Sequence, residues 1–438
     1  MNEGRRGEAE RSEEGPRGRH DGARGEGRGI PGEDPGTRDE GRVWAYPSDP
    51  KIHNPKNPDG LDGPQEVPLP PEPRGPVVAR VEHGGPDFAE LATLGIRPEA
   101  ILDFSVNKNP LGASPRALRA LVLVDASSYP DARCLRLRAG LAAAHDVRPE
   151  EVLVGNGSVE LIWLLGQVYL GPGDDVVIVG PTFGEYAAAA RRAGASIVQI
   201  DAKESDGFRP DVEAIAGAVR QIGPRAVFLC NPNNPTGQVL EPDAIRALLD
   251  VLGTGLLVVD EAYVELADGV ESVVPDIRRD ARLVVLRSLT KSHGLAGLRL
   301  GYLVGAPAVV EAVAGAQPPW SVNAFAQAAG MAALGDEEHV AEGRRLARRA
   351  RALLVDGLER LGLGCVPSRA SYWLVKVGDG RQVRDALLRR GILVRDARSF
   401  GLPAHMRVAA RPIDECERLL AVLGGLISSG TVQIGKVT

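Results

Sequence analysis

The sequence predicts an α/β protein with three parts: an N-terminal extension, a large domain built on a mostly parallel sheet, and a small α+β domain. Short apolar runs alternate with helical stretches from about residue 124 onward. This alternation is typical of parallel strands that are covered by helices on both faces. With 438 residues, 43% of them hydrophobic, the chain can bury a large core.

Residues 1–82 form the first predicted part. They are dense in Gly, Arg, Glu, Asp and Pro and carry few aliphatic side chains. Such a segment cannot bury enough apolar surface to offset the entropy lost on ordering, so we expect it to be disordered. Its Arg and Glu residues are mixed, and the net charge of the chain is -6, so nucleic-acid binding is not expected.

The remaining composition favours a cytoplasmic enzyme without a metal. No apolar segment near the start resembles a secretory signal, and no run is long enough for a membrane span. The four cysteines are scattered, which is typical of reduced thiols, and the seven histidines lack metal-ligand spacing.

The large domain is assigned to residues 124–326, and the small domain to residues 83–123 and 327–432. Seven apolar runs predict the strands of the large domain: 151–155, 174–180, 195–200, 226–230, 256–260, 282–288 and 299–305. Three runs predict the sheet of the small domain: 372–377, 391–396 and 405–410.

Polar motifs follow three of the predicted strands. The turn sequence NPNNPTG at 231–237 follows the first, Asp260 and Tyr263 end the second, and Lys291 and Arg299 follow the third. Taken singly, these residues are most simply a turn, a helix cap and a surface lysine. Because open α/β sheets bind ligands at the carboxyl ends of their strands, the three motifs together predict one site.

Lys291 is the residue that indicates the chemistry of this site. A lysine that forms a Schiff base needs a lowered pKa, and the nearby cation Arg299 helps to lower it. Ser288 and Arg299 could share one phosphate, the hydroxyl and the guanidinium both acting as donors. Lysine, hydroxyl and arginine together predict a site for pyridoxal 5'-phosphate (PLP).

On these motifs the chain resembles fold-type I PLP enzymes of the aspartate aminotransferase superfamily. The resemblance implies that Lys291 carries the cofactor covalently, that Asp260 pairs with the pyridine nitrogen, and that Asn234 and Tyr263 contact the 3'-oxygen. It further implies that Gly157 and Ser158 offer backbone N–H groups to the phosphate and that Phe183 stacks on the ring. Tyr129 would reach the cofactor phosphate of a neighbouring subunit, which implies an obligate homodimer with shared active sites.

Within this superfamily, residues 83–427 most resemble the cobalamin-pathway L-threonine-O-3-phosphate decarboxylases. Three segments carry the likeness: HGG at 83–85, DFSVNKNPLG at 103–112 and PPWSVNA at 318–324. The implied activity is decarboxylation of L-threonine O-3-phosphate, a phosphorylated amino acid, to (R)-1-amino-2-propanol phosphate. The implied substrate-binding residues are His83, Asn109, Arg407 and Arg411.

Several alternatives stay open. Histidinol-phosphate aminotransferases share the cofactor motifs, and the two reactions differ only in which bond at the substrate α-carbon stands perpendicular to the ring. Arg411 could instead be a solvated charge or a cap of the following helix. A transcription regulator with an aminotransferase-like domain is disfavoured because the extension lacks the periodicity of a helix-turn-helix. A catalytically inactive protein is disfavoured because the cofactor motifs occur together.

Overall fold

A computed structural model of the chain describes residues 78–433, so the predicted extension lies almost entirely outside the described residues. Only residues 78–82 of that extension are described, and Val81 and Glu82 line the main cavity. Within the described part of the chain, no helix is both long and apolar enough to cross a membrane.

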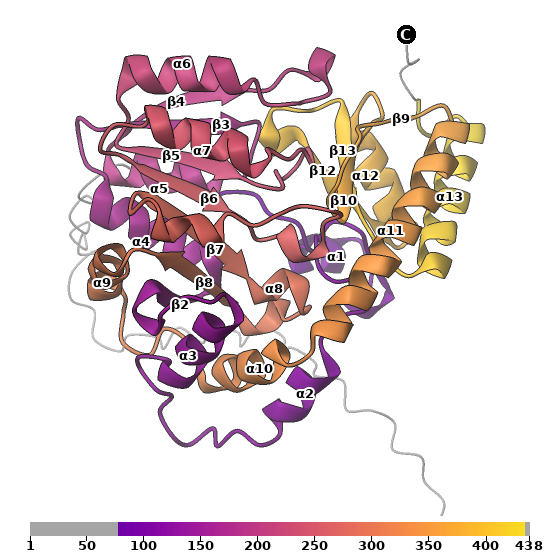
Figure 1. Ribbon diagram of the computed structural model, residues 1–438. Helices are drawn as coiled ribbons and strands as arrows, with labels where there is room; N and C mark the ends of the chain where they lie inside the picture. Colours follow the sequence, from indigo (N-terminus) through magenta and orange to yellow (C-terminus); the bar gives the residue numbers. More distant parts are fainter. Residues whose placement is uncertain (1–77, 434–438) are drawn as a thin grey trace, which may run out of the picture. The chain divides into compact units, whose positions relative to one another are not determined.

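A seven-stranded sheet organises residues 152–305 (Figure 1). In spatial order its strands are β2 (Val152–Asn156), β8 (Leu300–Gly305), β7 (Leu283–Ser288), β6 (Leu256–Asp260), β5 (Ala226–Cys230), β3 (Asp175–Gly180) and β4 (Ser196–Asp201). Only β8 runs antiparallel to its neighbours β2 and β7. All seven strands were predicted, and the mostly parallel α/β fold is confirmed.

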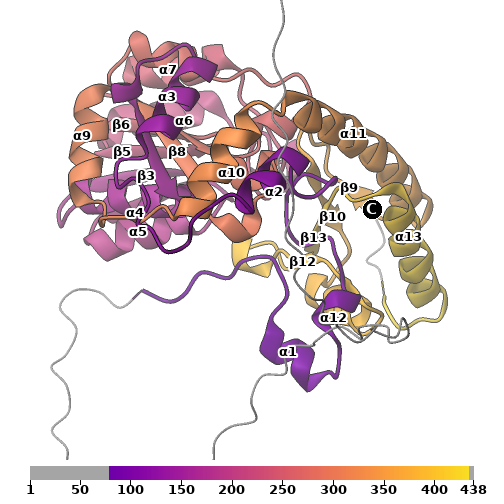
Figure 2. The same ribbon diagram turned by 90° about the horizontal axis from the view of Figure 1, so that it is seen from below.

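Helices cover both faces of this sheet, and successive residues of each strand enter opposite cores. In β6, for example, Leu257 and Val259 pack in one cluster, whereas Leu256 and Val258 pack in the other. Figure 2 shows α6 and α7 on one side of the strands and α4 and α5 on the other. The covering helices are α3 (Leu135–Ala144), α6 (Val212–Ile222), α7 (Pro242–Val251) and α10 (Ala324–Leu334) on one face, and α4 (Gly157–Tyr169), α5 (Glu185–Ala193) and α9 (Pro307–Ala316) on the other.

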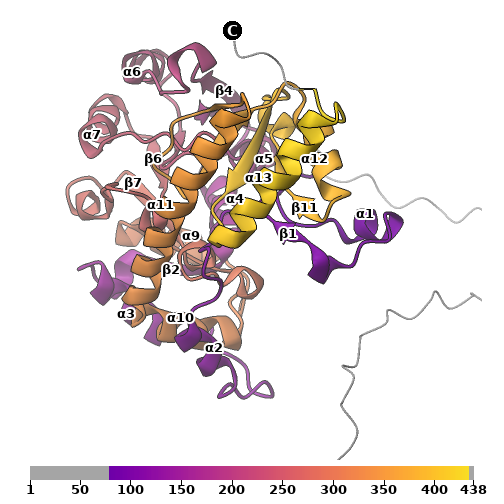
Figure 3. The same ribbon diagram turned by 90° about the vertical axis from the view of Figure 1, so that its right-hand side faces the viewer.

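The C-terminal part of the chain builds a second, smaller sheet with a separate core. Its strands are, in order, β12 (Arg395–Asp396), β13 (His405–Ala409), β10 (Tyr372–Lys376) and β9 (Gly364–Cys365). Its helices are α11 (Glu337–Arg360), α12 (Gly380–Leu388) and α13 (Ile413–Ser428), and α11 lies beside α13 (Figure 3). A parallel pair of β1 (Leu102–Asp103) and β11 (Ile392–Leu393) ties the N-terminal described residues to this part. The exact domain boundaries stay a prediction.

The remaining helices are short. They are α1 (Phe88–Thr93), α2 (Pro115–Leu121) and α8 (Leu289–Ser292). Helix α8 follows β7 directly and carries Lys291, so the sheet places this lysine at the carboxyl edge of its strands.

Candidate active site

A cavity of about 550 Å³ opens at the carboxyl edge of the seven-stranded sheet and is bounded on its other side by residues of the small sheet. Its volume is in the range of small-molecule sites. The predicted residues that line it are Ser158, Phe183, Asn234, Asp260, Tyr263, Ser288, Lys291, Arg299, His83 and Arg407.

Lys291 lies at the centre of this set and is half-buried at the wall of the cavity. Burial lowers its pKa to about 8, and the charges of Arg407 and Arg299 act in the same direction. Its Nζ lies 5.9 Å from the centre of the Tyr263 ring. A substantial fraction of this amine is therefore neutral near pH 8, as a nucleophile that attacks an aldehyde requires.

Asp260 ends β6 and is 3% exposed. The Tyr186 hydroxyl donates a hydrogen bond to its Oδ2 (2.7 Å), and the backbone N–H of Ala262 donates to its Oδ1 (3.0 Å). Burial raises the pKa of Asp260, while these two hydrogen bonds and the charge of Lys291 oppose that rise. The carboxylate is thus placed to pair with a protonated ring nitrogen.

The strand arrangement brings Gly157 and Arg299 together. Helix α4 begins at Gly157, whose φ is +76°, and a Cβ placed there would lie 2.6 Å from the Arg299 Nη2. Because β8 is antiparallel, its first residues lie at the same edge as the last residues of β2. Backbone N–H groups at the start of α4 and the Arg299 guanidinium therefore converge, as a phosphate site requires.

Arg407 is 4% exposed and projects from β13. Its guanidinium donates to Asn234 Oδ1 and to the carbonyl of Ser105, and burial lowers its pKa to about 10. Asn234, predicted as a cofactor contact, thus also holds the predicted substrate arginine.

Four predicted residues are not among those that line this cavity: Gly157, at the start of α4, and Asn109, Arg411 and Tyr129. Asn109 donates from its side chain to the carbonyl of Ser292 (2.9 Å) and so supports the backbone. Arg411 forms an ion pair with Glu415 at the start of α13 (2.7 Å), in keeping with the helix-cap alternative. Tyr129 is 82% exposed and contacts Trp320, with ring centres 4.8 Å apart.

The sequence analysis missed Arg395, Tyr186, Glu185 and Asn107. Arg395 stands opposite Arg407 in the β12–β13 register, and both guanidiniums lie near the Phe400 ring, at 5.5 and 6.0 Å. Its one sequence signal was a charge within a predicted apolar strand. Asn107 is 2% exposed and lines the cavity beside the Tyr263 side chain.

His83 lies at the rim of the cavity. Its Nε2 is 2.8 Å from Glu185 Oε1, and its ring centre is 5.6 Å from that of Phe183. Glu185 is 6% exposed, and its second oxygen accepts a hydrogen bond from Trp163 Nε1 (2.7 Å). His83 is therefore fixed from behind by a buried carboxylate.

These residues fit PLP. The cavity offers an amine with a lowered pKa, a buried carboxylate, an aromatic ring at Phe183, and the Arg299 guanidinium beside the start of α4. Each part matches one chemical group of the cofactor: aldehyde, pyridine nitrogen, ring face and phosphate.

Comparisons with known proteins agree with this assignment. Residues 99–423 match the family of class I and II aminotransferases. A histidinol-phosphate aminotransferase of Symbiobacterium thermophilum is 40% identical over 334 residues, which cover 75% of this chain and 91% of that protein. Histidinol-phosphate aminotransferase 2 of Pseudomonas aeruginosa is 38% identical over 353 residues, 78% of this chain and 94% of that protein. The crystal structure of a Sinorhizobium meliloti histidinol-phosphate aminotransferase with pyridoxal-5'-phosphate has the same fold, with a TM-score of 0.72 at 24% identity over 78% of this chain and 94% of the other.

The expected threonine-phosphate decarboxylase activity is wrong. The relatives that match at 34–40% identity over most of their length are named histidinol-phosphate aminotransferases. The lyase activity and the role in the cobalamin pathway are withdrawn with it. The prediction of a decarboxylase rested on short segments such as HGG. Such segments do not distinguish the decarboxylases from the histidinol-phosphate aminotransferases, which share the same cofactor site.

Proposed function

Because this chain belongs to the family of class I and II aminotransferases, whose cofactor is PLP, we propose that it transfers an amino group between L-histidinol phosphate and 2-oxoglutarate. The reaction moves the amino group and one hydrogen of the donor to the keto acid, which becomes glutamate. When bound, PLP supplies the electron sink for this chemistry.

The observation that carries the proposal is the pair Arg395 and Arg407. These guanidiniums are 8% and 4% exposed, face each other in register, and line one cavity. Arg407 contacts no carboxylate in the described part of the chain, and Arg395 has only Glu82, at 3.8 Å. Two buried cations without a close counterion favour a doubly charged anion, such as a phosphate monoester.

Two further side chains support a phosphorylated substrate. Lys108 lines the same cavity, and His83 lies at its rim. In the second half of the reaction, the carboxylates of 2-oxoglutarate would occupy the place of the phosphate, since both bind arginine in the same bidentate manner.

Lys291 would hold and move the proton in this reaction. Its amine can take the proton from the α-carbon of the donor, provided that it is neutral at the working pH, and can give a proton to the α-carbon of the keto acid when glutamate is formed. Tyr263 and Asn234 would hold the ring oxygen beside it, in keeping with their places in the cavity.

We also propose a homodimer. Four large apolar residues lie exposed around α2, α3 and α10 of the chain: Val122 (83%), Leu123 (85%), Tyr129 (82%) and Trp320 (48%). Exposed apolar groups of this size mark an interaction surface. Since Tyr129 does not line the cavity of its own chain, it would act in the partner's site.

A parallel donor assay tests the proposed substrate. Glutamate formation from 2-oxoglutarate would be followed with L-histidinol phosphate, unphosphorylated L-histidinol and L-aspartate as donors. We expect kcat/KM to be highest for histidinol phosphate and to fall towards the value for histidinol in Arg395→Met. Equal values for histidinol phosphate and histidinol would show that the arginine pair does not bind the phosphate. A preference for aspartate would point to a dicarboxylate aminotransferase.

A further inference from the structure

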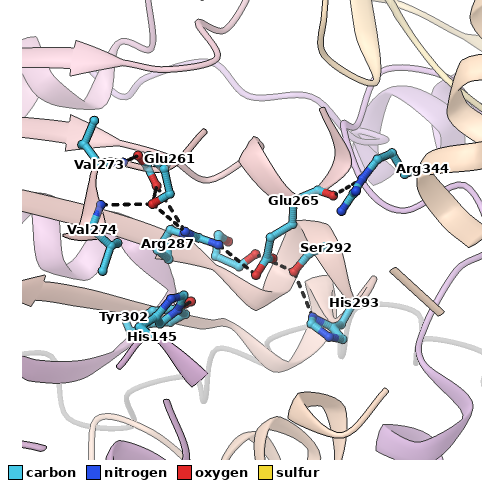
Figure 4. Close-up of polar contacts among 12 residues, drawn as sticks. His145, Glu261, Glu265, Val273, Val274, Arg287, Ser292, His293, Tyr302 and Arg344 are labelled. Carbon is cyan, nitrogen blue, oxygen red and sulfur yellow. Dashed lines mark hydrogen bonds and ion pairs between the residues drawn. The ribbon is translucent and has the colours of Figure 1, made fainter. Parts of the chain in front are cut away.

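A network of charged and polar side chains, with the buried residues Glu261 and Arg287 among them, is built on the chain segments that also line the cavity, and Figure 4 shows its polar contacts. Three of its members are immediate sequence neighbours of residues that line the cavity: Glu261 follows Asp260, Arg287 precedes Ser288, and Ser292 follows Lys291. Along a strand, successive side chains point to opposite sides. In β7 this alternation turns Ser288 to the cavity and Arg287 to the network, and helix α8 likewise presents Lys291 to the cavity and Ser292 to the network.

Arg287 is the centre of this network and is 5% exposed. Its Nη1 lies 3.1 Å from Glu261 Oε2, and its Nη2 lies 3.0 Å from Glu265 Oε1. Glu261 also accepts hydrogen bonds from the Ser272 hydroxyl (2.6 Å) and the Val273 backbone N–H (2.8 Å). The guanidinium thus joins the end of β7 to the segment that follows β6.

Glu265 extends the network to the helix that carries the lysine. Its carboxylate accepts a hydrogen bond from the Ser292 hydroxyl, which lies 2.9 Å from Nδ1 of His293 (Figure 4). Helix α8 has only four residues, too few to be stable alone. The position of Lys291 therefore depends on contacts that other parts of the chain make with α8.

The network has a defined charge state. Burial alone would raise the pKa of Glu265, but the charge of Arg287, the nearby His293 and the hydrogen bonds from Ser292 and Arg287 together outweigh it, and the pKa of Glu265 is lowered. His145, hydrogen-bonded to Tyr302 beside Arg287, has its pKa lowered to about 4, chiefly by burial and further by Arg287. Glu265 and Arg287 thus form a charged pair near neutral pH, and His145 adds no second cation. Burial raises the pKa of Glu261, while the Arg287 charge and the hydrogen bonds from Ser272 and Val273 oppose that rise.

We infer that Glu261, Glu265 and Arg287 form a positioning network that fixes the ends of β6 and β7 and helix α8 relative to one another. In doing so the network keeps Asp260, Ser288 and Lys291 in register with different parts of one cofactor. None of the three network residues lines the cavity, so each acts through the chain segment to which it belongs or that it contacts. The inference concerns the cofactor site and holds whichever amino donor the enzyme uses.

Glu265→Gln in the holoenzyme tests the inference, because Glu265 contacts both Arg287 and Ser292. The first readout is the rate at which bound PLP is lost, followed by its visible absorbance after dilution into buffer with a PLP scavenger. We expect loss about tenfold faster, as befits one weakened charged hydrogen bond. In the amino-transfer assay we expect kcat to fall and the KM of the amino donor to stay unchanged, since the network does not contact substrate.

Glu151→Gln is the matched control. Like Glu265, Glu151 is paired with an arginine, Arg148, at 3.0 Å, but it does not line the cavity or join the network. We expect this variant to unfold at a lower temperature and to keep the wild-type rate of PLP loss. If Glu265→Gln lost PLP no faster than Glu151→Gln at matched stability, the positioning role would be refuted.

Ser292→Ala decides the matter if Glu265→Gln does not fold. It removes only the hydroxyl that links Glu265 to α8 and leaves the charges of the network intact. We expect several-fold faster loss of PLP, and a wild-type rate would overturn the inference. The PLP readout needs no substrate, so it separates failure of this inference from failure of the proposed substrate.

Discussion

Glu185→Gln gives the sharpest test of how the cavity holds a phosphorylated substrate. Burial would raise the pKa of Glu185, but hydrogen bonds from His83 and Trp163 outweigh it, and the pKa is lowered. The ionised carboxylate therefore accepts from both side chains at once, at 2.8 and 2.7 Å. A glutamine can accept on one side only, because its amide nitrogen is a donor. The substitution should leave His83 without a fixed orientation.

The size of the effect follows from the kind of bond that is lost. A hydrogen bond to a charged group contributes about 1.5–3 kcal/mol and a neutral one about 0.5–1.5 kcal/mol, so the difference is about 1 kcal/mol. The side chain of His83 is 46% exposed, so solvent screening keeps the loss of binding free energy at or below about 1 kcal/mol. About 1 kcal/mol corresponds to a roughly fivefold rise in KM for histidinol phosphate.

The assay compares the KM of histidinol phosphate and of histidinol in three variants: Glu185→Gln, His83→Ala and the double variant. We expect both single variants to raise the KM of the phosphorylated donor only, with PLP binding intact, and the double variant to add little. An unchanged KM in His83→Ala would remove His83 from the substrate site. A rise in His83→Ala without one in Glu185→Gln would show that His83 needs no support from Glu185.

Three further predictions concern the cofactor. Since burial lowers the pKa of Lys291 to about 8, the rate of PLP capture by the apoenzyme should rise with pH and level off above about pH 8. Stopped-flow absorbance would measure this rate, and a rise that continued to pH 10 would contradict the prediction. Tyr186→Phe removes a hydrogen bond that favours ionised Asp260, so the acid limb of the pH profile of kcat/KM should move up by about one pH unit. An unmoved acid limb would show that Tyr186 does not help to keep Asp260 ionised. Gly157→Ala places a Cβ at positive φ against Arg299, so the affinity for PLP, measured by fluorescence titration, should fall about tenfold. Wild-type affinity would show that the phosphate site can adjust to the added methyl group.

The cofactor site was largely predictable because its residues follow strands that the hydrophobic pattern identifies. Asp260 ends β6, and Lys291 follows β7, so the position of each strand end fixed the position of the side chain. The spacing of short motifs along the chain was sufficient to predict that these side chains share one site, because parallel strands present their carboxyl ends at one edge of the sheet.

The substrate side was less predictable because tertiary register decides it. Arg395 enters the cavity only because β12 pairs with β13 opposite Arg407. Asn107 faces the cavity, whereas Asn109, two residues later, donates to a backbone carbonyl, and the motif itself does not distinguish the two. The same limit explains the mistaken decarboxylase activity: the choice of bond at the α-carbon depends on how the substrate lies between such groups, which short motifs do not record.

The antiparallel strand β8 has a consequence for biosynthesis. Gly157 stands at the end of the first strand of the sheet to be made, β2, while its partner Arg299 precedes β8, the last. Arg407 is synthesised later still. A nascent chain that ends before β8 therefore lacks half of its phosphate site, and contacts so distant in sequence form late in folding. Capture of PLP should accordingly follow synthesis of the sheet rather than assist it, and the colour of the bound cofactor would report that β8 has been inserted between β2 and β7.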